Sequence, residues 1–499
     1  MKKFFQNTPI FLFLLPVFFV LHGVNENFGY INVPDCLLLM FTYTGACALL
    51  YFLLLPFFKN YVKAALMATY LMAFYCFFGA VHDFLRVHSD FLHKYTVLMP
   101  AFVILGFIIL IYLKRKKSSF IKLSLFINTL LLIYLAVDGG GIIWKMIFPS
   151  PNKLAVYSFA KNNTYGTCSD CPKPDIYFLL FDEYASSLSL KQKFNYDNSD
   201  LDTFLTKSGF QIQTKSRSNY NFTPFSMSSI LNMSYLHGFF DPNAINSDDY
   251  AYCNNLIKDN EVIKFLSYQG YDIDNYSVFD LAGNPSKVEQ SFLPLKTKLI
   301  TDRTLFGYLK KDIGWMLYTG KWEIKWFTEN TFFGQVTNND RLIAGIERES
   351  ETKAIHPRFI YGHIYLPHPP FFYDKNGNLK DKATIYKESM ADKFSDAYLD
   401  YLPYTNSRIK ELIETIQRNT HDSAVIIFMG DHGFRDKTTE PYPIYHFQNQ
   451  NAVYFPDKDY HLFYDSITNV NMFRMIFNKL FKQNIPLLKD TSIFLHDKP

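Results

Sequence analysis

The chain is poor in charge, since Asp, Glu, Lys and Arg make up only 19% of its 499 residues, whereas hydrophobic residues make up 48%. That combination excludes a disordered chain, which needs low hydrophobicity and high charge. The formal net charge of +4 is too small for a dominant polyanion-binding surface, so we expect no nucleic-acid partner. Internal repeats and low-complexity segments are also absent, which excludes a repeat architecture.

The few charges are unevenly distributed along the chain. Residues 1–150 hold 12 Lys and Arg and 5 Asp and Glu, a balance of +7. Subtraction from the chain totals of 50 and 46 leaves 38 and 41 for residues 151–499, a balance of −3. A basic, apolar first third followed by a mildly acidic remainder predicts a membrane anchor joined to a second domain. The length also exceeds that of one ordinary domain, about 100–200 residues.

The anchor is predicted from five apolar stretches. Each is long enough for a membrane span, which takes about 17–25 residues. Pro9, Pro16 and His22 interrupt the first stretch, for which a signal peptide is the alternative interpretation. We expect five spans, at residues 8–24, 36–58, 64–81, 95–113 and 120–137.

Orientation follows from the basic residues between the stretches. Lys2, Lys3, Lys59, Lys63 and the run 114–117 fall on one side, which the positive-inside rule makes cytoplasmic. An odd number of spans then places the rest of the chain on the periplasmic or extracellular side of a cell membrane. We divide the chain into a transmembrane domain (1–150), a linker (151–172) and an extracytoplasmic catalytic domain (173–499), with a hinge at the glycines 139–141.

The six cysteines agree with this placement but do not establish it. Cys36, Cys47 and Cys76 lie in predicted spans, where a thiol behaves as a small apolar side chain. Cys168 and Cys171 follow the membrane region as Cys-x-x-Cys, and no second pair or nearby His completes a zinc site. A linker disulfide or an idle pair is the favoured interpretation, and a redox or metal role the weaker one.

Past residue 172, strand and helix patterns alternate. Short apolar runs at 175–181 and 423–429 are typical of buried strands, and further strands are expected at 210–213, 271–276, 358–365 and 452–455. Helical patterns lie around 198–208, 259–268, 391–418 and 467–482. The alternation predicts an α/β layered domain with a largely parallel sheet, whose ligands bind at the carboxyl ends of the strands.

Acidic residues end both apolar runs. Asp182 and Glu183 follow the first run, and Gly-Asp-His-Gly, with Asp431 and His432, follows the second. Either group alone is more often a solvated loop or a helix cap. At the same edge of a parallel sheet, however, the two groups come close together.

A third element adds a hydroxyl. Thr223 has the chemistry of a helix N-cap and Pro224 that of the first helical position, so an ordinary helix start explains both locally. A helix N-terminus is also a site for phosphate or sulfate. A hydroxyl there, beside a metal held by Asp and His, is suited to attack phosphorus.

This order of Asp at a strand end, Thr at a helix start and Gly-Asp-His-Gly downstream resembles the alkaline phosphatase superfamily. The closest resemblance is to membrane-anchored sulfatase-like proteins, including lipoteichoic acid synthases and phosphoethanolamine transferases. The resemblance implies a five-helix transmembrane bundle followed by an alkaline-phosphatase-like α/β/α sandwich. It also implies one divalent ion, Mn²⁺ or Zn²⁺, bound by Asp182, Thr223, Asp431 and His432. Glu183 is the neighbouring alternative to Asp182, although the register of the apolar run favours Asp182.

The segment around His363 and His368 is a fourth element. The phosphoethanolamine transferases have a similar His-x4-His followed by Pro, and by that likeness His368 contacts the phosphate or the leaving group. His363 is the weaker candidate, because a His on an apolar strand is more often a hydrogen-bonded core residue. Arg435 is positioned to pair with a phosphate oxygen, with a plain surface charge as the equal alternative.

The resemblance implies a transferase that moves a phosphoryl-containing group, such as phosphoethanolamine or glycerol phosphate, through a phosphothreonine. Its partners are then a membrane phospholipid donor and an envelope glycan or lipid acceptor. Thr-Pro-Phe-Ser-Met around Thr223 lacks the Cys/Ser-x-Pro-x-Arg frame that formylglycine sulfatases need, so the likeness to sulfatases is one of shape. A membrane-tethered phosphatase or phosphodiesterase, or another sulfatase-like hydrolase, is the alternative, and a catalytically idle scaffold is a third interpretation.

Overall fold

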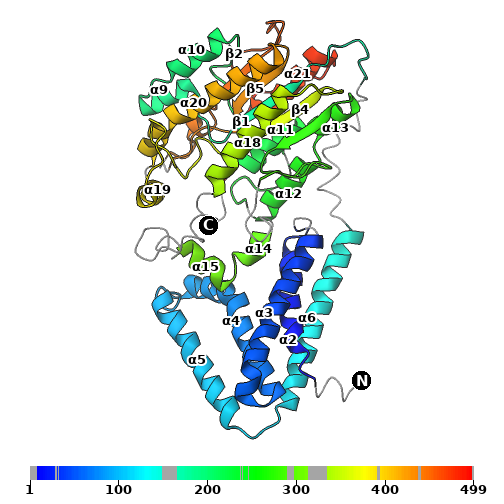
Figure 1. Cartoon of the computed structure of the whole chain (residues 1–499), viewed down its shortest axis with the longest axis vertical. Coiled ribbons are helices and arrows are strands. Elements are labelled where there is room, and N and C mark those ends of the chain that lie inside the picture. Colours follow the sequence, from blue (N-terminus) through cyan, green and yellow to red (C-terminus); the bar gives the residue numbers. More distant parts are fainter. Residues whose placement is uncertain are drawn as a thin grey trace. The chain divides into compact units, whose positions relative to one another are not determined.

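A computed structural model gives the fold of the chain (Figure 1). It describes residues 8–28, 31, 33–148, 166–236, 238, 240–245, 247–288, 297–312, 334–389, 391, 394–436 and 440–496. The chain divides into two compact units, which we describe separately. One comprises residues 1–151 and 290–317, and the other residues 152–289 and 318–499.

The first unit is built on five apolar helices, namely α2 (Phe11–Glu26), α3 (Val33–Phe58), α4 (Tyr61–His88), α5 (Tyr95–Arg115) and α6 (Ile121–Ile147). The last four are long and apolar enough to cross a membrane, whereas α2 is a shorter apolar helix of 16 residues. The four later stretches therefore coincide with helices that fit a membrane anchor. The prediction of a fifth span at α2 stays a prediction.

The expected hinge at the glycines 139–141 is wrong. These glycines continue α6, which runs to Ile147 without a break. Glycine is common in membrane helices, where neighbouring helices compensate its low helix propensity. A Cβ on Gly141 would lie 2.9 Å from the Asn25 side chain, so close packing against α2 accounts for at least this glycine.

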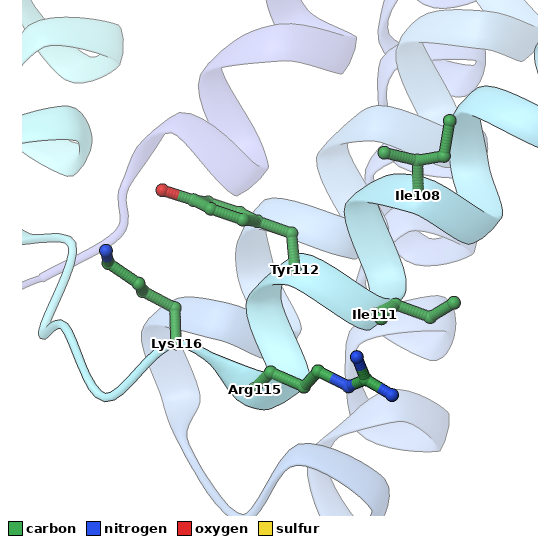
Figure 2. A pocket seen from close by; sticks show the side chains of 5 residues that line it. All are labelled: Ile108, Ile111, Tyr112, Arg115 and Lys116. Atoms are coloured by element: carbon green, nitrogen blue, oxygen red, sulfur yellow. The ribbon is translucent and has the colours of Figure 1, made fainter.

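One end of α5 carries a shallow cavity of about 440 Å³ (Figure 2). Two isoleucines, an aromatic residue and two basic residues line it, namely Ile108, Ile111, Tyr112, Arg115 and Lys116. Tyrosine followed by Lys and Arg is typical of the boundary between the apolar and polar regions of a membrane. This end of α5 therefore has the composition expected where the helix leaves the membrane.

Two short helices, α14 (Lys298–Thr301) and α15 (Leu305–Asp312), also belong to the first unit. Their sequence lies inside the range 173–499 that we assigned to the catalytic domain. Within the described residues they pack on α2 and α4. The sequence that we assigned to the catalytic domain therefore contains a segment, residues 297–312, that packs in the helical unit. We call this segment the excursion, and no local sequence pattern predicts it.

The second unit contains a six-stranded sheet in the order β2-β6-β5-β1-β4-β3. Its strands are β1 (Ile176–Phe181), β2 (Gln211–Ile212), β3 (Asp272–Tyr276), β4 (Arg358–Ile364), β5 (Val425–Gly430) and β6 (Asn451–Tyr454). The four strands β3, β4, β1 and β5 are parallel, while β6 pairs antiparallel with both β5 and β2. The predicted largely parallel sheet is confirmed.

Helices cover both faces of the sheet, because alternate side chains of a strand point to opposite faces. Tyr177, Leu179 and Phe181 of β1 belong to one core cluster, and Ile176 and Phe178 to the other. The first cluster includes α9 (Ser187–Phe194), α10 (Ser199–Lys207), α18 (Gly334–Glu351) and α20 (Ser395–Thr420). The second includes α11 (Thr223–Asn232), α12 (Ser247–Lys258), α13 (Glu261–Tyr268) and α21 (Met472–Phe481). The unit is the expected α/β/α sandwich, completed by α19 (Lys382–Ser389), η2 (Ile444–His446) and η3 (Asn469–Asn471).

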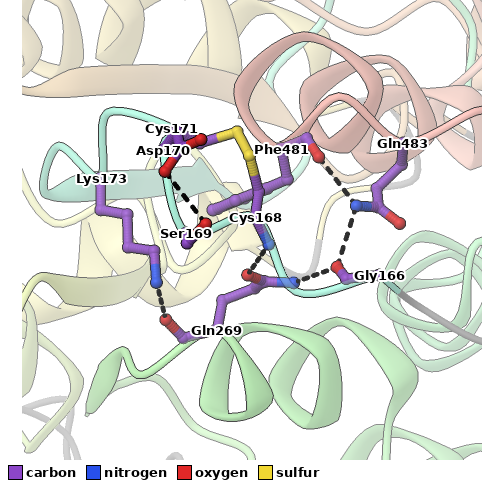
Figure 3. The surroundings of a disulfide bond; sticks show 9 residues. All are labelled: Gly166, Cys168, Ser169, Asp170, Cys171, Lys173, Gln269, Phe481 and Gln483. Carbon is purple, nitrogen blue, oxygen red and sulfur yellow. Dashed lines mark hydrogen bonds between the residues drawn. A yellow bond between two sulfur atoms is a disulfide. The ribbon is translucent and has the colours of Figure 1, made fainter.

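The cysteine pair before β1 forms a disulfide (Figure 3). The Gln269 side chain accepts a hydrogen bond from the Cys168 N–H and donates one to the Gly166 carbonyl, while Lys173 donates to the Gln269 carbonyl. Of the two favoured interpretations, a linker disulfide and an idle pair, the structure shows the disulfide. It closes a loop that is fastened to the end of α13.

Candidate active site

The sheet brings the two acidic groups together. Strands β1 and β5 are parallel neighbours with Phe181 opposite Gly430, so Asp182 and Asp431 leave the same edge side by side. Asp182, Asp431 and His432 each offer a ligand atom, and these three atoms lie within 4.8 Å of one another. All three residues are buried. Residues 249 positions apart in sequence thus form one cluster.

Close backbone approaches explain the two glycines of Gly-Asp-His-Gly. A Cβ on Gly430 would lie 2.5 Å from the Tyr184 carbonyl oxygen. On Gly433 it would overlap the Tyr445 carbonyl oxygen. Neither backbone neighbour can move cheaply, so the loop that presents Asp431 and His432 requires glycine at both positions.

Three lone pairs converge in the cluster. Asp182 Oδ1 and Asp431 Oδ2 are buried, and neither has a hydrogen-bond partner among the described residues. His432 Nδ1 lies 2.8 Å from the Gly433 carbonyl oxygen, so the proton is on Nδ1 and the lone pair on Nε2. That Nε2 lies 3.2 Å from Asp431 Oδ2. Buried oxygens without a donor are costly, and a divalent cation is the group that would satisfy all three atoms.

The pKa values of the three residues also reflect their burial. Burial, reinforced by Asp182, raises the pKa of Asp431 to about 6. Burial, reinforced by Arg435, lowers the pKa of His432 to about 3, so its ring is neutral at neutral pH. Burial also acts to raise the pKa of Asp182, but His368 and the other neighbouring imidazoles outweigh it and hold that pKa below its ordinary value. Two carboxylates and a neutral imidazole form a ligand set suited to Zn²⁺ or Mn²⁺.

Thr223 lies beside the cluster, but not in the local role that we expected. The N-cap of α11 is Phe222, with no capping side chain, and Thr223 is the first helical residue. Because its hydroxyl is not used as a cap, it faces the cluster, with Oγ1 3.2 Å from His432 Nε2. It is therefore placed both to contact a bound metal and to act as a nucleophile.

The two predicted histidines differ in position. His363 is fully buried in β4, with Nε2 3.1 Å from Asp182 Oδ2 and Nδ1 3.1 Å from the Tyr361 hydroxyl. It contacts Asp182 Oδ2 and so orients that carboxylate, whose Oδ1 has no hydrogen-bond partner among the described residues. His368 is half-buried after the strand, with Nδ1 2.6 Å from the Pro369 carbonyl oxygen. Its Nε2 is thus the ring atom left for a substrate.

Glu183 and Arg435 form a second pair beside the cluster. The Glu183 backbone N–H donates to Asp431 Oδ1 at 2.9 Å, while its side chain accepts from the Arg435 backbone N–H at 3.0 Å. The Glu183 backbone has φ 62°, a left-handed conformation, and its carboxylate pairs with the Arg435 side chain at 3.3 Å. Arg435 also lies over the Phe222 ring, 4.9 Å from its centroid, and is partly exposed. Glu183 is thus a positioning residue, and Arg435 is the cation next to Thr223.

Three features were not predicted from the sequence. Two are residues that form hydrogen bonds within or just after β4, and the third is an Asp-x-x-x-His spacing. Tyr361 shares a strand face with His363, a signal that the two-residue alternation contains. Asn339 of α18 bonds the backbone N–H and C=O of Tyr365, each at 3.0 Å, and nothing in the sequence indicates it. An Asp-x-x-x-His pair, the spacing that holds a second metal in two-metal members of the superfamily that the sequence resembles, also occurs at Asp457 and His461. These two residues follow β6, which runs antiparallel to β5, so they lie away from the edge that carries Asp431.

Part of the chain matches a known family model. Residues 284–492 match the family model described as Sulfatase. The match includes His363, His368, Asp431 and His432 and begins after Asp182 and Thr223. Among curated proteins, none matches the chain significantly in sequence.

Solved structures similar to the chain include transferases and a hydrolase. The C-terminal periplasmic domain of EptC from Escherichia coli, in complex with Zn, is 9% identical over 65% of this chain and 90% of that one (TM-score 0.40). The corresponding domain of the phosphoethanolamine transferase EptC from Campylobacter jejuni is 12% identical over 66% and 97% (TM-score 0.39). Phosphonate monoester hydrolase of Agrobacterium radiobacter is 11% identical over 62% and 73% (TM-score 0.38).

Residues 284–492 are thus similar to the Sulfatase family, and helices that fit a membrane anchor precede this region. Buried Asp and His residues of the α/β unit form a group that could hold a metal ion.

Proposed function

We propose that the protein transfers a phosphoryl-containing group from a membrane phospholipid to a hydroxyl of an envelope glycan or lipid, through a phosphothreonine at Thr223. The placement of the Thr223 hydroxyl, 3.2 Å from His432 Nε2 and at the start of α11, carries this proposal. A threonine in this position cannot form formylglycine, so sulfate-ester hydrolysis of the formylglycine type does not fit the residue.

The reaction has two balanced steps. In the first, Thr223 Oγ1 releases its proton to water and bonds to the donor phosphorus, while the bond from phosphorus to the diacylglycerol oxygen breaks. His368 Nε2 delivers a proton to that leaving oxygen. In the second, the acceptor oxygen bonds to phosphorus, its proton passes to His368, and Thr223 Oγ1 leaves and takes a proton back from water. Each step exchanges one P–O bond for another, so no oxidant or reductant is needed.

The remaining residues bind and orient. Asp182, Asp431, His432 and Thr223 would hold one Mn²⁺ or Zn²⁺, which when bound supplies positive charge that lowers the pKa of the threonine hydroxyl. The backbone N–H groups at the start of α11 point toward the phosphate position, as in other helix-terminal phosphate sites. Arg435, held by Glu183, supplies a charge-assisted hydrogen bond to a phosphate oxygen.

The membrane anchor supports a phospholipid as the donor. An enzyme that is held to a membrane meets phospholipid at a high local concentration, and a phosphodiester headgroup such as phosphoethanolamine or glycerol phosphate fits a Thr nucleophile with a leaving-group acid. We place the catalytic unit on the periplasmic or extracellular side, in accordance with the basic residues at 59, 63 and 114–117. A disulfide at Cys168 and Cys171 is compatible with that oxidising side.

The test uses the full-length protein in vesicles that contain headgroup-labelled phospholipid. With an added glycan or lipid acceptor, the label should move to the acceptor, and without an acceptor it should stop after at most one label per chain. Continuous release of the free headgroup phosphate in the absence of acceptor would instead establish the hydrolase alternative. No labelled product of either kind, from a protein that holds its metal, would contradict both.

A further inference from the structure

Residues 297–312 pack against α2 and α4 at positions where these two helices carry glycine. A Cβ on Gly79 of α4 would overlap the Arg303 carbonyl oxygen and lie 2.6 Å from the Tyr308 ring. A Cβ on Gly23 of α2 would lie 2.7 Å from Ile300. Two helices thus each lack a side chain at the point where the excursion contacts them.

Burial and directional bonds hold the excursion in place. Ile300 is 2% exposed and belongs to the core cluster of α2, α3 and α4. Burying such a side chain contributes roughly 1.5–3 kcal/mol. The Gly79 N–H donates to the Arg303 carbonyl at 3.1 Å, and the Tyr308 hydroxyl donates to the Asp83 carboxylate.

One further contact is an ion pair. Arg303 and Glu26 lie 2.7 Å apart, but their side chains are 57% and 43% exposed. An exposed pair contributes at most about 1 kcal/mol, so packing into the glycine sites, rather than charge, accounts for most of the docking.

Two segments of the α/β unit that flank the excursion in sequence contact the segment carrying His363 and His368. Before the excursion, the Phe279 ring lies 5.5 Å from the ring of His363. After it, Asn339 bonds the backbone of Tyr365, which lies between His363 and His368. In sequence, the excursion therefore lies between two segments of the α/β unit that each contact the segment carrying the histidines.

The docked excursion gives the two units a second covalent connection, which is shorter than the first. Eighteen residue steps join Phe148 of the helical unit to Gly166 of the α/β unit, a fully extended length of about 65 Å. Nine steps join Val288 of the α/β unit to Thr297 of the docked excursion, at most about 32 Å. The second tether thus halves the distance that the catalytic unit can travel from the membrane helices.

We infer that residues 297–312 are a docking element that keeps the active site within reach of lipid donors, so that turnover of membrane phospholipid, but not of a soluble phosphodiester, depends on it. The inference rests on the proposed function. Halving the accessible radius reduces the accessible volume, and undocking should therefore lower the effective donor concentration by about five- to ten-fold.

The test compares Gly79→Leu with Gly45→Leu in the full-length protein in vesicles. Gly45 is a matched control, because a Cβ there meets no atom within 4 Å. The two donors are headgroup-labelled phospholipid and the soluble diester bis-p-nitrophenyl phosphate. Gly79→Leu should lower lipid turnover by about five- to ten-fold and leave turnover of the soluble diester unchanged, whereas Gly45→Leu should change neither.

A second measurement reports docking directly. The pair Gly23→Cys and Ile300→Cys should form a disulfide in an otherwise unchanged chain, and adding Gly79→Leu should prevent it. Equal loss with both donors, or unchanged lipid turnover while the cysteine pair no longer forms, would overturn the inference. A wild-type protein that turns over the soluble diester but no phospholipid would instead contradict the proposed function.

Discussion

The Thr223 hydroxyl lies 3.2 Å from His432 Nε2, although 209 residues separate them in sequence. The carboxyl end of β5 presents His432, and the first turn of α11 presents Thr223. Because Thr223 makes no capping bond, its hydroxyl is not needed for the helix. Substitution of Thr223 should therefore affect catalysis much more than the stability of the fold.

Thr223→Ala should abolish turnover and change the free energy of unfolding by less than about 1 kcal/mol, since no cap is lost. Thr223→Ser should keep part of the activity. Ser226→Ala is the matched control on the same helix, because its buried hydroxyl donates to the Asp431 carbonyl at 2.6 Å. The control should destabilise the protein by roughly 1–3 kcal/mol and remain active. Assays of turnover and of thermal unfolding distinguish the two patterns.

Asp431→Asn combined with His432→Ala should remove the bound metal, since two of the proposed ligands are lost. Asp374→Asn, in a turn where the carboxylate accepts only local hydrogen bonds, is the control and should bind as much metal as wild type. Elemental analysis of the purified full-length protein measures both. A double variant that keeps the metal content of wild type would show that these are not the ligands.

Asp431→Asn should stabilise the metal-free protein more at pH 7.5 than at pH 5. Burial, with Asp182 close by, raises the pKa of Asp431 to about 6, above its ordinary value of 3.8. The folded state then binds a proton at Asp431 more tightly than the unfolded chain does, so the contribution of Asp431 to stability falls as pH rises from about 4 through 6. Asp431→Asn should accordingly stabilise the metal-free protein at pH 7.5, by roughly 1–3 kcal/mol.

Thermal unfolding in a chelator, across this pH range, tests that expectation. With metal bound, the same substitution should destabilise the protein, because Asp431 is then a proposed ligand. If Asp431→Asn changed the stability of the chelated protein equally at pH 5 and pH 7.5, the raised pKa of Asp431 would not be the source of the effect.

His363→Ala should weaken metal affinity by about 10- to 100-fold, the usual effect of losing the group that orients a metal ligand. His363 bonds Asp182 Oδ2 and leaves Oδ1 directed at the cluster. Tyr361→Phe should have a smaller effect, because it removes only the hydroxyl that faces His363 Nδ1. Metal titration gives both affinities, and an unchanged affinity in His363→Ala would assign the residue to the core alone.

Much of this site was predictable because strand ends are local features. An apolar run followed by acidic residues marks a strand terminus, and parallel pairing then brings Asp182 and Asp431 to one edge. The choice between Asp182 and Glu183 needed the backbone, since the left-handed conformation of Glu183 turns its carboxylate toward Arg435. The sequence likewise predicted a helix start at Thr223, but not that its hydroxyl faces His432.

The excursion of residues 297–312 could not be predicted in this way. Lys298-Leu-Ile-Thr has too few residues for a periodic pattern, and its partners Gly23 and Gly79 are more than 200 positions away. Docking depends on shape complementarity between a side chain and an absent Cβ, which a single sequence does not display. The same reason explains the glycines 139–141, where packing in a helix and a flexible hinge have the same composition.

Mass spectrometry of the peptide that contains Thr223 tests the central claim most directly. Wild-type protein quenched after exposure to a phospholipid donor, with no acceptor present, should carry one phosphoryl-containing group on Thr223, and addition of acceptor before the quench should remove it. Thr223→Ala should never carry the group. Full turnover of the donor by a folded Thr223→Ala protein, or a wild-type peptide that stays unmodified throughout turnover, would contradict the covalent mechanism.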